Sequence, residues 1–347
     1  MAAEQVLRVI DFASVSGLRS QTLWHAVATG VSQGQAPTLC FMRPNQAYVS
    51  LGYHRSLSEV DLDACHSQGL AVYRRMVGGG PVYLDPAQQF FQLILPMSMV
   101  PPVRANAIEW LLGPAAEALT AAGLPAQLDT RPGRMEIVAD GRKVCGHGAG
   151  QIEDAMVLVG NCLESFDAGA ATKTLAISDP LLLGAVERTM DRFVATPQYR
   201  VSAEVFKEVA TKAYAAAIGL DPVPGELVEA ELDRLGELDR QFSSAEWLEG
   251  PLVATARGAR AIKIKGGVYV LAAQSGSLRA VLVWIEGVID EISLTGSFLD
   301  QADLDAASAA VTGRTIPQAI GDVGEMFGGE LRAALGSIDQ RALEAGR

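Results

Sequence analysis

The sequence predicts an α+β protein made of two consecutive domains. The chain has 347 residues, which is more than one average domain needs. Apolar residues alternate with a period of two over several short segments, as they do in half-buried β-strands. Strand-like and helix-like segments come in groups rather than in strict alternation, which is typical of α+β folds.

The first region contains most of the predicted strands. Period-2 patterns predict strands at residues 6–12, 38–43, 47–53, 70–77, 81–85 and 90–96, and again within 136–152 and 155–165. Helical periodicity predicts helices at 18–31, 105–123 and 202–219. We expect these strands to form the sheets of a larger domain and the helices to flank them.

The second region follows two prolines, Pro222 and Pro224. The pattern predicts a charged helix at 227–242, then alternating strands over 252–298 with glycine turns, then helices over 300–335. We therefore predict a larger domain at 1–240 and a small α+β domain at 250–347.

The composition excludes several classes of protein. With 49% apolar and 20% charged residues, the chain resembles ordinary globular proteins. It shows neither an apolar run of the ~18 residues that span a membrane nor a signal pattern, so we expect a cytoplasmic protein that acts without a membrane. A net charge of −12 disfavours nucleic-acid binding. The four cysteines form no CxxC pair, which predicts free thiols: Cys40, Cys65, Cys145 and Cys162.

The densest chemical signal is the segment RRMVGGGPVYLD, from Arg74 to Asp85, between two predicted strands. Three consecutive glycines allow backbone N–H groups to approach an anion closely. Two arginines just before them carry planar guanidinium groups that pair with carboxylate or phosphate. The spacing matches neither a Walker loop nor a GxGxxG fingerprint. Three glycines alone are more often a hairpin turn, but their combination with the arginines favours an anion site.

The second signal is DGRKVCGHGAG, from Asp140 to Gly150. Asp-Gly predicts a tight turn, and Lys143 follows it at the start of a strand with glycine at 146, 148 and 150. Glycines in a strand leave room for a ligand or another backbone, and an ammonium fixed there stabilises charge on an acyl-phosphate oxygen. Taken alone, this segment is better explained as an ordinary hairpin with an exposed lysine.

Together and in this order, the two segments resemble those of lipoate–protein ligases, within the biotin and lipoate protein ligase fold. That family carries an RRxxGGGxVxHD loop followed by a GRKxxGxA segment, matched here by Arg74–Asp85 and Gly141–Gly148. Residues 267–296 resemble the family's accessory C-terminal domain. The resemblance implies a catalytic domain of mixed and antiparallel sheets with flanking helices. It implies ATP-dependent activation of lipoate or octanoate to acyl-AMP, followed by transfer to a lysine of a lipoyl carrier protein.

The resemblance also implies the site. Arg75 and Lys143 would be catalytic, with Arg75 on the acyl carbonyl or phosphate and Lys143 on the acyl-adenylate, and Glu136 would be an acidic neighbour of Mg²⁺. ATP and Mg²⁺ are the implied cofactors, lipoate the substrate, and a lipoyl domain or a glycine cleavage H-like protein the partner of a monomeric enzyme. The residues implied to bind the acid and the nucleotide are Arg74, Gly78, Gly79, Gly80, Pro81, Val82, Tyr83, Asp85, Gly146, His147 and Gly148.

Two alternatives stay open. Leu84 replaces the family's loop histidine, and Val159 replaces a later one, which motivates a non-catalytic lipoyl-binding relative. Cys145 lies two residues from Lys143, and strand alternation would put both side chains on one face. That allows an ATP-independent octanoyl or lipoyl transferase with a thioester intermediate. In related transferases the cysteine precedes the GRK segment, and the corresponding stretch 128–134 has none.

Overall fold

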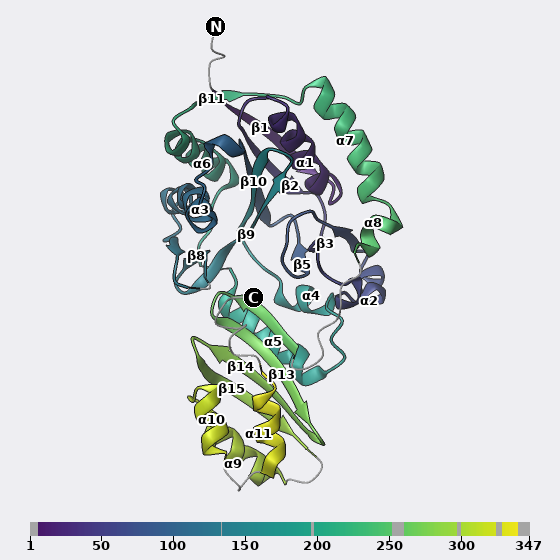
Figure 1. The fold of residues 1–347 in the computed structure, drawn as a ribbon, viewed down its shortest axis with the longest axis vertical. Coiled ribbons are helices and arrows are strands. Elements are labelled where there is room, and N and C mark those ends of the chain that lie inside the picture. The colour runs from purple at the N-terminus through teal and green to yellow at the C-terminus, as the bar shows by residue number, and fades with distance from the viewer. Residues whose placement is uncertain are drawn as a thin grey trace. The chain divides into compact units, whose positions relative to one another are not determined.

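The structure, a computed structural model, describes residues 6–132, 134–195, 198–251, 260–296, 300–323 and 328–338. Within these ranges the chain forms two compact units, described here one at a time (Figure 1). The first comprises Met1–Asp129, Glu136–Ala176 and Ala195–Val253, and the second Thr130–Met135, Ile177–Val194 and Ala254–Arg347. The α+β class predicted from the sequence is confirmed.

An eight-stranded mixed sheet forms the centre of the first unit, in the order β11-β1-β2-β6-β10-β9-β8-β7. β11 and β2 run parallel to β1, and the other neighbours are antiparallel. The strands are β1 (Val6–Val15), β2 (Thr38–Pro44), β6 (Gln88–Pro96), β7 (Gln127–Asp129), β8 (Glu136–Ala139), β9 (Arg142–Ile152), β10 (Ala155–Leu163) and β11 (Asp221–Pro224).

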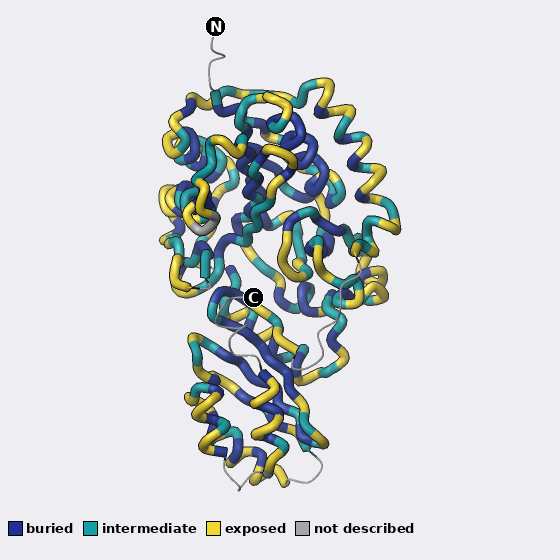
Figure 2. The backbone as a smooth tube through the Cα atoms, viewed as in Figure 1, coloured by how far each residue is buried: buried dark blue, intermediate teal, exposed yellow. Residues whose placement is uncertain are grey.

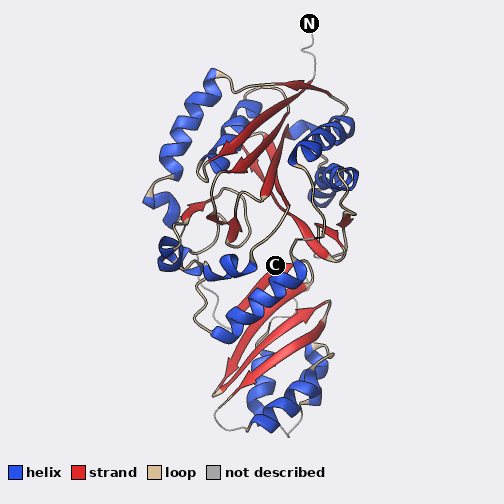
Figure 3. Cartoon of the chain, turned by 180° about the vertical axis from the view of Figure 1, so that it is seen from behind, coloured by secondary structure: helices blue, strands red, loops and turns tan. Residues whose placement is uncertain are grey.

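Helices cover both faces of this sheet (Figure 3). α3 (Arg104–Ala121) and α6 (Ala203–Ile218) lie on one face, where Phe91 of β6 packs against Phe206 and Tyr214. We call this the α6 face. α1 (Arg19–Ser32) lies on the other, called the α1 face, and α7 (Glu229–Phe242) packs against α1. β2, β6 and β10 are buried along most of their length (Figure 2), which explains their nearly continuous apolar sequence.

A three-stranded sheet carries the glycine-rich segment. Its central strand, β3 (Tyr48–Leu51), pairs in parallel with β4 (Ala71–Arg74) and antiparallel with β5 (Val82–Leu84). Residues 75–81, which we call the glycine loop, connect β4 to β5 and so pass from one side of β3 to the other. Two short helices, α2 (Leu62–Ser67) and α4 (Ala168–Lys173), contact this sheet.

The second unit is built on an antiparallel sheet of β12 (Arg260–Lys265), β13 (Val268–Ser275), β14 (Leu278–Ile285) and β15 (Val288–Thr295). Its core includes buried residues of α9 (Gln301–Val311), α10 (Ile316–Asp322) and α11 (Gly328–Gly336). The glycine turns predicted between these strands are present at Gly267 and Gly287, and both residues have positive φ. Residues 252–259 and 297–298 of the predicted strand run lie outside the described residues.

Helix α5 (Pro180–Phe193) belongs to the second unit, although the sequence analysis predicted no helix there. It packs on β12, β13 and β14. Its buried positions, Leu182, Ala185, Val186 and Thr189, have helical spacing that the sequence contained. As packed units, the two parts are therefore interleaved in sequence, and the functional domain limits 1–240 and 250–347 stay a prediction.

β11 forms at the two prolines that the sequence analysis treated as a break. It is an edge strand paired only with β1 among the described strands, where a missing N–H group is tolerated. After it, α7 and α8 (Ala245–Glu249) complete the first unit. Within the ranges that the structure describes, no helix combines the length and the apolar character that crossing a membrane requires.

Candidate functional site

The glycine loop is exposed at Gly78, Gly79 and Gly80. Only Gly79 needs to be glycine for the fold, because its φ is +101° and a Cβ there would lie 2.7 Å from Arg75 Nη2. A Cβ at Gly78 or Gly80 would meet no atom within 4 Å. Packing of the described fold therefore gives no reason for glycine at these two positions, whereas close approach of a ligand to the backbone would.

Arg75 shapes the loop from inside. Its guanidinium donates to the carbonyl oxygens of Gly78 (2.8 Å), Gly80 (2.9 Å) and Ser50 (2.6 Å). The residue is 9% exposed, and burial lowers the pKa of Arg75 to about 10, so the group stays cationic at neutral pH. In this conformation the guanidinium holds loop carbonyls, and the predicted contact of Arg75 with a substrate remains a prediction.

Arg74 does not face a ligand, which corrects its predicted binding role. It is 0% exposed. Its Nε, Nη1 and Nη2 atoms are all engaged, so no guanidinium nitrogen is left for an anion. The acceptors are the carbonyl oxygens of Gly52, Tyr53, Arg55, Trp247, Leu248 and Glu249.

Val77 joins the glycine loop to β9. It is 4% exposed and belongs to the apolar cluster on the α1 face, together with Ile94 and Val157. A Cβ at Gly148 would lie 3.3 Å from Val77, and one at Gly150 would lie 3.4 Å away. The room predicted beside these strand glycines is therefore filled by a side chain of the loop, and the two sequence motifs meet on the α1 face.

The third strand glycine has a similar explanation. A Cβ at Gly146 would lie 2.3 Å from Asn161 Oδ1 of the neighbouring strand β10. Asn161 in turn donates to Gln88 Oε1 at 2.5 Å. Alternation from Gly148 puts Gly146 on the α1 face. No local pattern in the sequence predicts the pairing of Asn161 with Gln88, because it depends on the strand order β6-β10-β9.

Lys143 lies on the same face as the strand glycines. Ile137 of β8 pairs with Cys145, whereas Val138 pairs with Lys143. This bulge reverses the alternation, so Lys143 and Cys145 point to opposite faces although they are two residues apart. Lys143 Nζ donates to Glu136 Oε1 at 3.2 Å, and the two side chains are 23% and 7% exposed. An ammonium held by a buried carboxylate thus lies on the same face of the sheet as the glycine loop.

Cys145 is on the α6 face and is 0% exposed. Burial, the largest effect, raises the pKa of its thiol to about 12. The expectation that Cys145 shares a face with Lys143 is wrong, because alternation fails at the bulge. Burial also raises the pKa of Cys40, Cys65 and Cys162, so all four cysteines are buried, free and protonated at neutral pH.

His147 also points to the α6 face. It pairs with Gly160, and a Cβ at Gly160 would lie 2.2 Å from the Phe91 ring, which packs against α6. Paired residues share a face, so the side chain of His147 is directed away from the glycine loop. Its predicted ligand contact is corrected by this orientation.

The remaining predicted residues lie at the end of the glycine loop and in β5. Val82 is 39% exposed, and Pro81 and Tyr83 are partly buried. Asp85 Oδ1 accepts the Ala87 N–H at 2.9 Å, and burial, followed by nearby carboxylates, raises its pKa. Asp85 therefore closes the turn after β5, and its contact with a ligand stays a prediction.

The predicted metal role of Glu136 stays a prediction. Its carboxylate is bonded to Lys143. No cluster of three His, Cys, Asp or Glu residues able to hold a metal ion occurs in the described ranges. Mg²⁺ is usually held by one or two carboxylates together with substrate phosphates.

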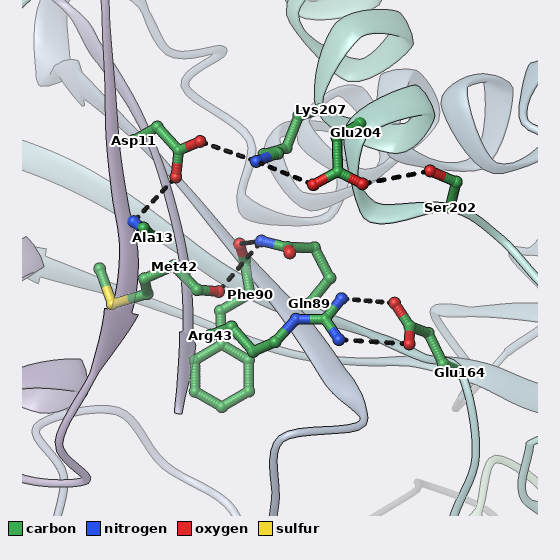
Figure 4. Close-up of polar contacts among 10 residues, drawn as sticks. All are labelled: Asp11, Ala13, Met42, Arg43, Gln89, Phe90, Glu164, Ser202, Glu204 and Lys207. Atoms are coloured by element: carbon green, nitrogen blue, oxygen red, sulfur yellow. Dashed lines mark hydrogen bonds and ion pairs between the residues drawn. The ribbon is translucent and has the colours of Figure 1, made fainter. Parts of the chain in front are cut away.

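A second group of charged residues lies near the ends of β1, β2 and β10 (Figure 4). Arg43 pairs with Glu164, with its nearest contact at 2.5 Å. Lys207 of α6 pairs with Asp11 at 2.7 Å. Each cation faces a carboxylate and joins two elements, so we interpret this cluster as structural cross-links.

Comparison with known proteins gives the same family as the motifs. Residues 18–194 match the model of the lipoyl protein ligase A/B catalytic domain. Octanoyltransferase LipM of Moorella thermoacetica is 27% identical over 244 residues, 61% of this chain and 86% of the relative. LipM of Staphylococcus aureus is 24% identical over 251 residues, 64% of this chain and 91% of the relative.

Solved structures share the fold. A bi-partite lipoate protein ligase of Thermoplasma acidophilum superposes with a TM-score of 0.63 at 19% identity, over 73% of this chain and 100% of that one. LipL1 of P. falciparum in complex with lipoate gives 0.54 at 14% identity, over 92% of this chain and 93% of that one. At such identities the likeness concerns the fold, and the family follows from the match over residues 18–194: the chain belongs to the lipoyl protein ligase A/B catalytic-domain family.

Proposed function

We propose that this enzyme activates lipoate or octanoate with ATP as an acyl-adenylate and transfers the acyl group to a lysine of a lipoyl carrier. One observation carries the proposal. The bulge in β9 directs Lys143 to the α1 face, on which the glycine loop packs, whereas every cysteine of the chain is buried. The chain therefore offers a cation for a mixed anhydride and lacks an accessible thiolate for a thioester.

In the first step, a carboxylate oxygen of the acid forms a bond to the α-phosphorus of ATP and pyrophosphate leaves. The exposed amides of the glycine loop can approach the phosphate oxygens, since Gly78 and Gly80 have open space where a Cβ would be. Arg75 fixes the loop in the shape that presents these amides. Holding both reactants in line supplies much of the rate. A magnesium ion would be held by the triphosphate oxygens together with one or two carboxylates of the chain.

In the second step, the neutral amine of a carrier lysine attacks the acyl carbonyl, AMP leaves with the bonding electron pair, and the nitrogen releases a proton to solvent. Negative charge develops on the carbonyl oxygen, and the Lys143 ammonium stabilises it. Glu136 keeps that ammonium in place, 3.2 Å away. The Thermoplasma ligase belongs to a lipoylation system with an E2 lipoyl domain, and we propose a carrier of that kind here.

The apolar chain of the acid requires an apolar surface next to the loop. The cluster on the α1 face supplies one, because Met76, Leu84 and Val159 lie at its edge, partly buried. Leu84 and Val159 occupy the positions where the family pattern has histidines. We therefore infer that these two positions increase the apolar contact with the acyl chain.

ATP-independent octanoyl transfer through Cys145 is the second candidate. It is favoured by the two relatives that are named octanoyltransferases. Burial and the raised pKa of about 12 oppose it, because the reacting species is the thiolate. A lipoyl-binding relative without turnover is the third.

One assay separates the three. The chain is incubated with an apo lipoyl domain and either octanoate with ATP and Mg²⁺, or an octanoylated carrier without ATP, and the acceptor is weighed by mass spectrometry. Our proposal expects an acyl adduct only with ATP. An adduct from the octanoylated carrier that disappears in Cys145→Ser would establish the transferase instead. Measurable octanoate binding with no adduct in either arm would establish the binding protein.

A further inference from the structure

Residues 225–250, which we call the strap, lie outside the segment 18–194 that matches the family model. They contain α7 and α8, and both ends of the strap are fixed to the rest of the first unit. At the first end, buried Arg8 of β1 pairs with Glu231 of α7, with an Nη2–Oε1 distance of 2.5 Å. A Cβ at Gly225 or at Gly30 would collide with one or other of these side chains, so the chain is shaped around this pair.

At the second end, the strap is held by Arg74. The last carbonyl groups of a helix have no partner within the helix and carry partial negative charge. In α8 these are the carbonyls of Trp247, Leu248 and Glu249, and the Arg74 guanidinium donates to all three at 2.8–3.1 Å. Gly250, with φ +66°, follows at once, and a Cβ there would lie 2.3 Å from Arg74 Nε.

Trp247 completes the contact in the opposite direction. Its indole Nε1–H donates to the Arg74 carbonyl oxygen at 2.9 Å. Its ring stacks on Phe242 of α7, with centroids 4.3 Å apart and an interplanar angle of 18°. The Ser244 hydroxyl caps α8 by accepting the Trp247 N–H. Arg74 and Trp247 therefore form a reciprocal pair, which we call the clamp.

The clamp reaches the glycine loop through the residues that follow β3. Arg74 Nη1 donates to the carbonyl oxygens of Gly52 and Tyr53 at 3.1 and 2.8 Å. A Cβ at Gly52 would lie 1.9 Å from the Gly79 carbonyl oxygen, and the Tyr53 N–H donates to the Val77 carbonyl oxygen. A shift of α8 would therefore move the backbone against which the loop is packed.

We propose that Arg74 and Trp247 are positioning residues, which transmit the docking of the strap to the glycine loop and so set the affinity for the carboxylic acid. The inference rests on the proposed function for its ligand. Its physical basis does not depend on that function. The Arg74 guanidinium is fully buried, and the acceptors named above include no carboxylate. Six carbonyl dipoles stabilise its charge instead, three from the strap and three from the loop after β3. Loss of the strap carbonyls would leave the buried guanidinium with half of its acceptors.

The test uses the full-length chain with Trp247→Phe and Arg74→Lys. The first keeps the aromatic ring and removes the N–H donor, and the second keeps the charge and removes the planar fork. Glu231→Gln is the matched control, because it weakens the other end of the same strap. Hydrogen exchange of the amides at 76–80 reports on the loop without any ligand, and steady-state kinetics with octanoate separate KM from kcat.

We expect faster exchange at 76–80 and a KM for octanoate raised about 10-fold in both clamp variants, with kcat changed less than about 3-fold. Glu231→Gln should lower the melting temperature and leave both loop exchange and KM as in the wild type. Unchanged loop exchange in Trp247→Phe would overturn the proposal, as would equal effects in Glu231→Gln. If Arg74→Lys fails to fold, Trp247→Phe still decides. A wild-type chain inactive on octanoate would reject the proposed function, and the exchange data would still judge the clamp.

Discussion

The glycine loop and the start of β9 each bring a cation to the candidate site, and they use it in different ways. Arg75, 9% exposed, is bonded to carbonyl oxygens of its own loop and of β3. The Lys143 side chain, 23% exposed, is bonded to one carboxylate on the α1 face. The difference indicates that the loop cation maintains structure and that the strand cation is available for chemistry. Conservative changes in the two regions should then have separable effects on stability and on rate.

The largest expected effect is that of Lys143→Ala. The variant should lose about 10²-fold or more in the rate of acyl transfer, the usual cost of removing one oxyanion contact. Glu136 loses its bond to Lys143 in this variant, so circular dichroism must show that the protein is folded. Lys143→Arg is the matched control, which keeps the charge. Full turnover by folded Lys143→Ala would remove the lysine from the mechanism and abolish the contrast with Arg75.

Arg75→Met should mainly reduce stability. The substitution leaves the carbonyls of Ser50, Gly78 and Gly80 without their donor. The Ser50 bond is buried, and an unsatisfied buried group costs about 1–3 kcal/mol, whereas the two glycine carbonyls lie at the exposed loop and cost less. We expect the free energy of unfolding in urea to fall by about 2–4 kcal/mol, well beyond the change in Lys143→Arg. Wild-type stability of Arg75→Met would show that the loop does not depend on this cation.

Alanine substitutions within the loop sharpen the same comparison. Gly79→Ala should cost about 1–2 kcal/mol, because its φ of +101° is strained for any side chain. Gly78→Ala and Gly80→Ala should leave stability within about 0.5 kcal/mol of the wild type, since nothing lies within 4 Å of the added Cβ. Both should nevertheless raise the KM for ATP or for the acid. Unchanged kinetics for these two variants would mean that no ligand approaches the loop.

The smallest expected effect concerns Cys145 and pH. With its pKa raised to about 12 in the folded chain, the thiol stays neutral between pH 7 and 9. Iodoacetamide should therefore leave Cys145 unmodified in the native protein over this range and alkylate it in urea. The ordinary pKa of a cysteine thiol is 9.0. Above that pH the thiol ionises in the unfolded chain but not in the folded one, so the free energy of unfolding falls as the pH rises from 9 toward 12 and is unaffected below pH 9. Rapid native alkylation at pH 8 would contradict the buried assignment.

The sequence predicted the class, most strands and the two motifs, because these depend on local patterns. It could not predict which way charged groups turn. Arg74 and Arg75 are adjacent, yet one bonds the strap and the other the loop. The Arg74 acceptors, and Ser50 among those of Arg75, lie in distant segments. Alternation wrongly put Cys145 beside Lys143, because a bulge has no sequence signature as strong as the period it interrupts. α5 was missed although its spacing was present, and its packing unit could not be inferred from its position in the chain.

The central claim is that the acyl group is activated on phosphate rather than on sulfur. It is tested most directly by incubating the chain with octanoate, ATP and Mg²⁺ without any carrier, and analysing both small molecules and intact protein by mass spectrometry. We predict octanoyl-AMP from the wild type and from Cys145→Ala, and no mass added to the protein. A parallel sample replaces octanoate and ATP with an octanoylated carrier as the acyl donor. An octanoyl adduct on the wild-type chain in that sample, missing in Cys145→Ala, together with no octanoyl-AMP in the first incubation, would contradict the account.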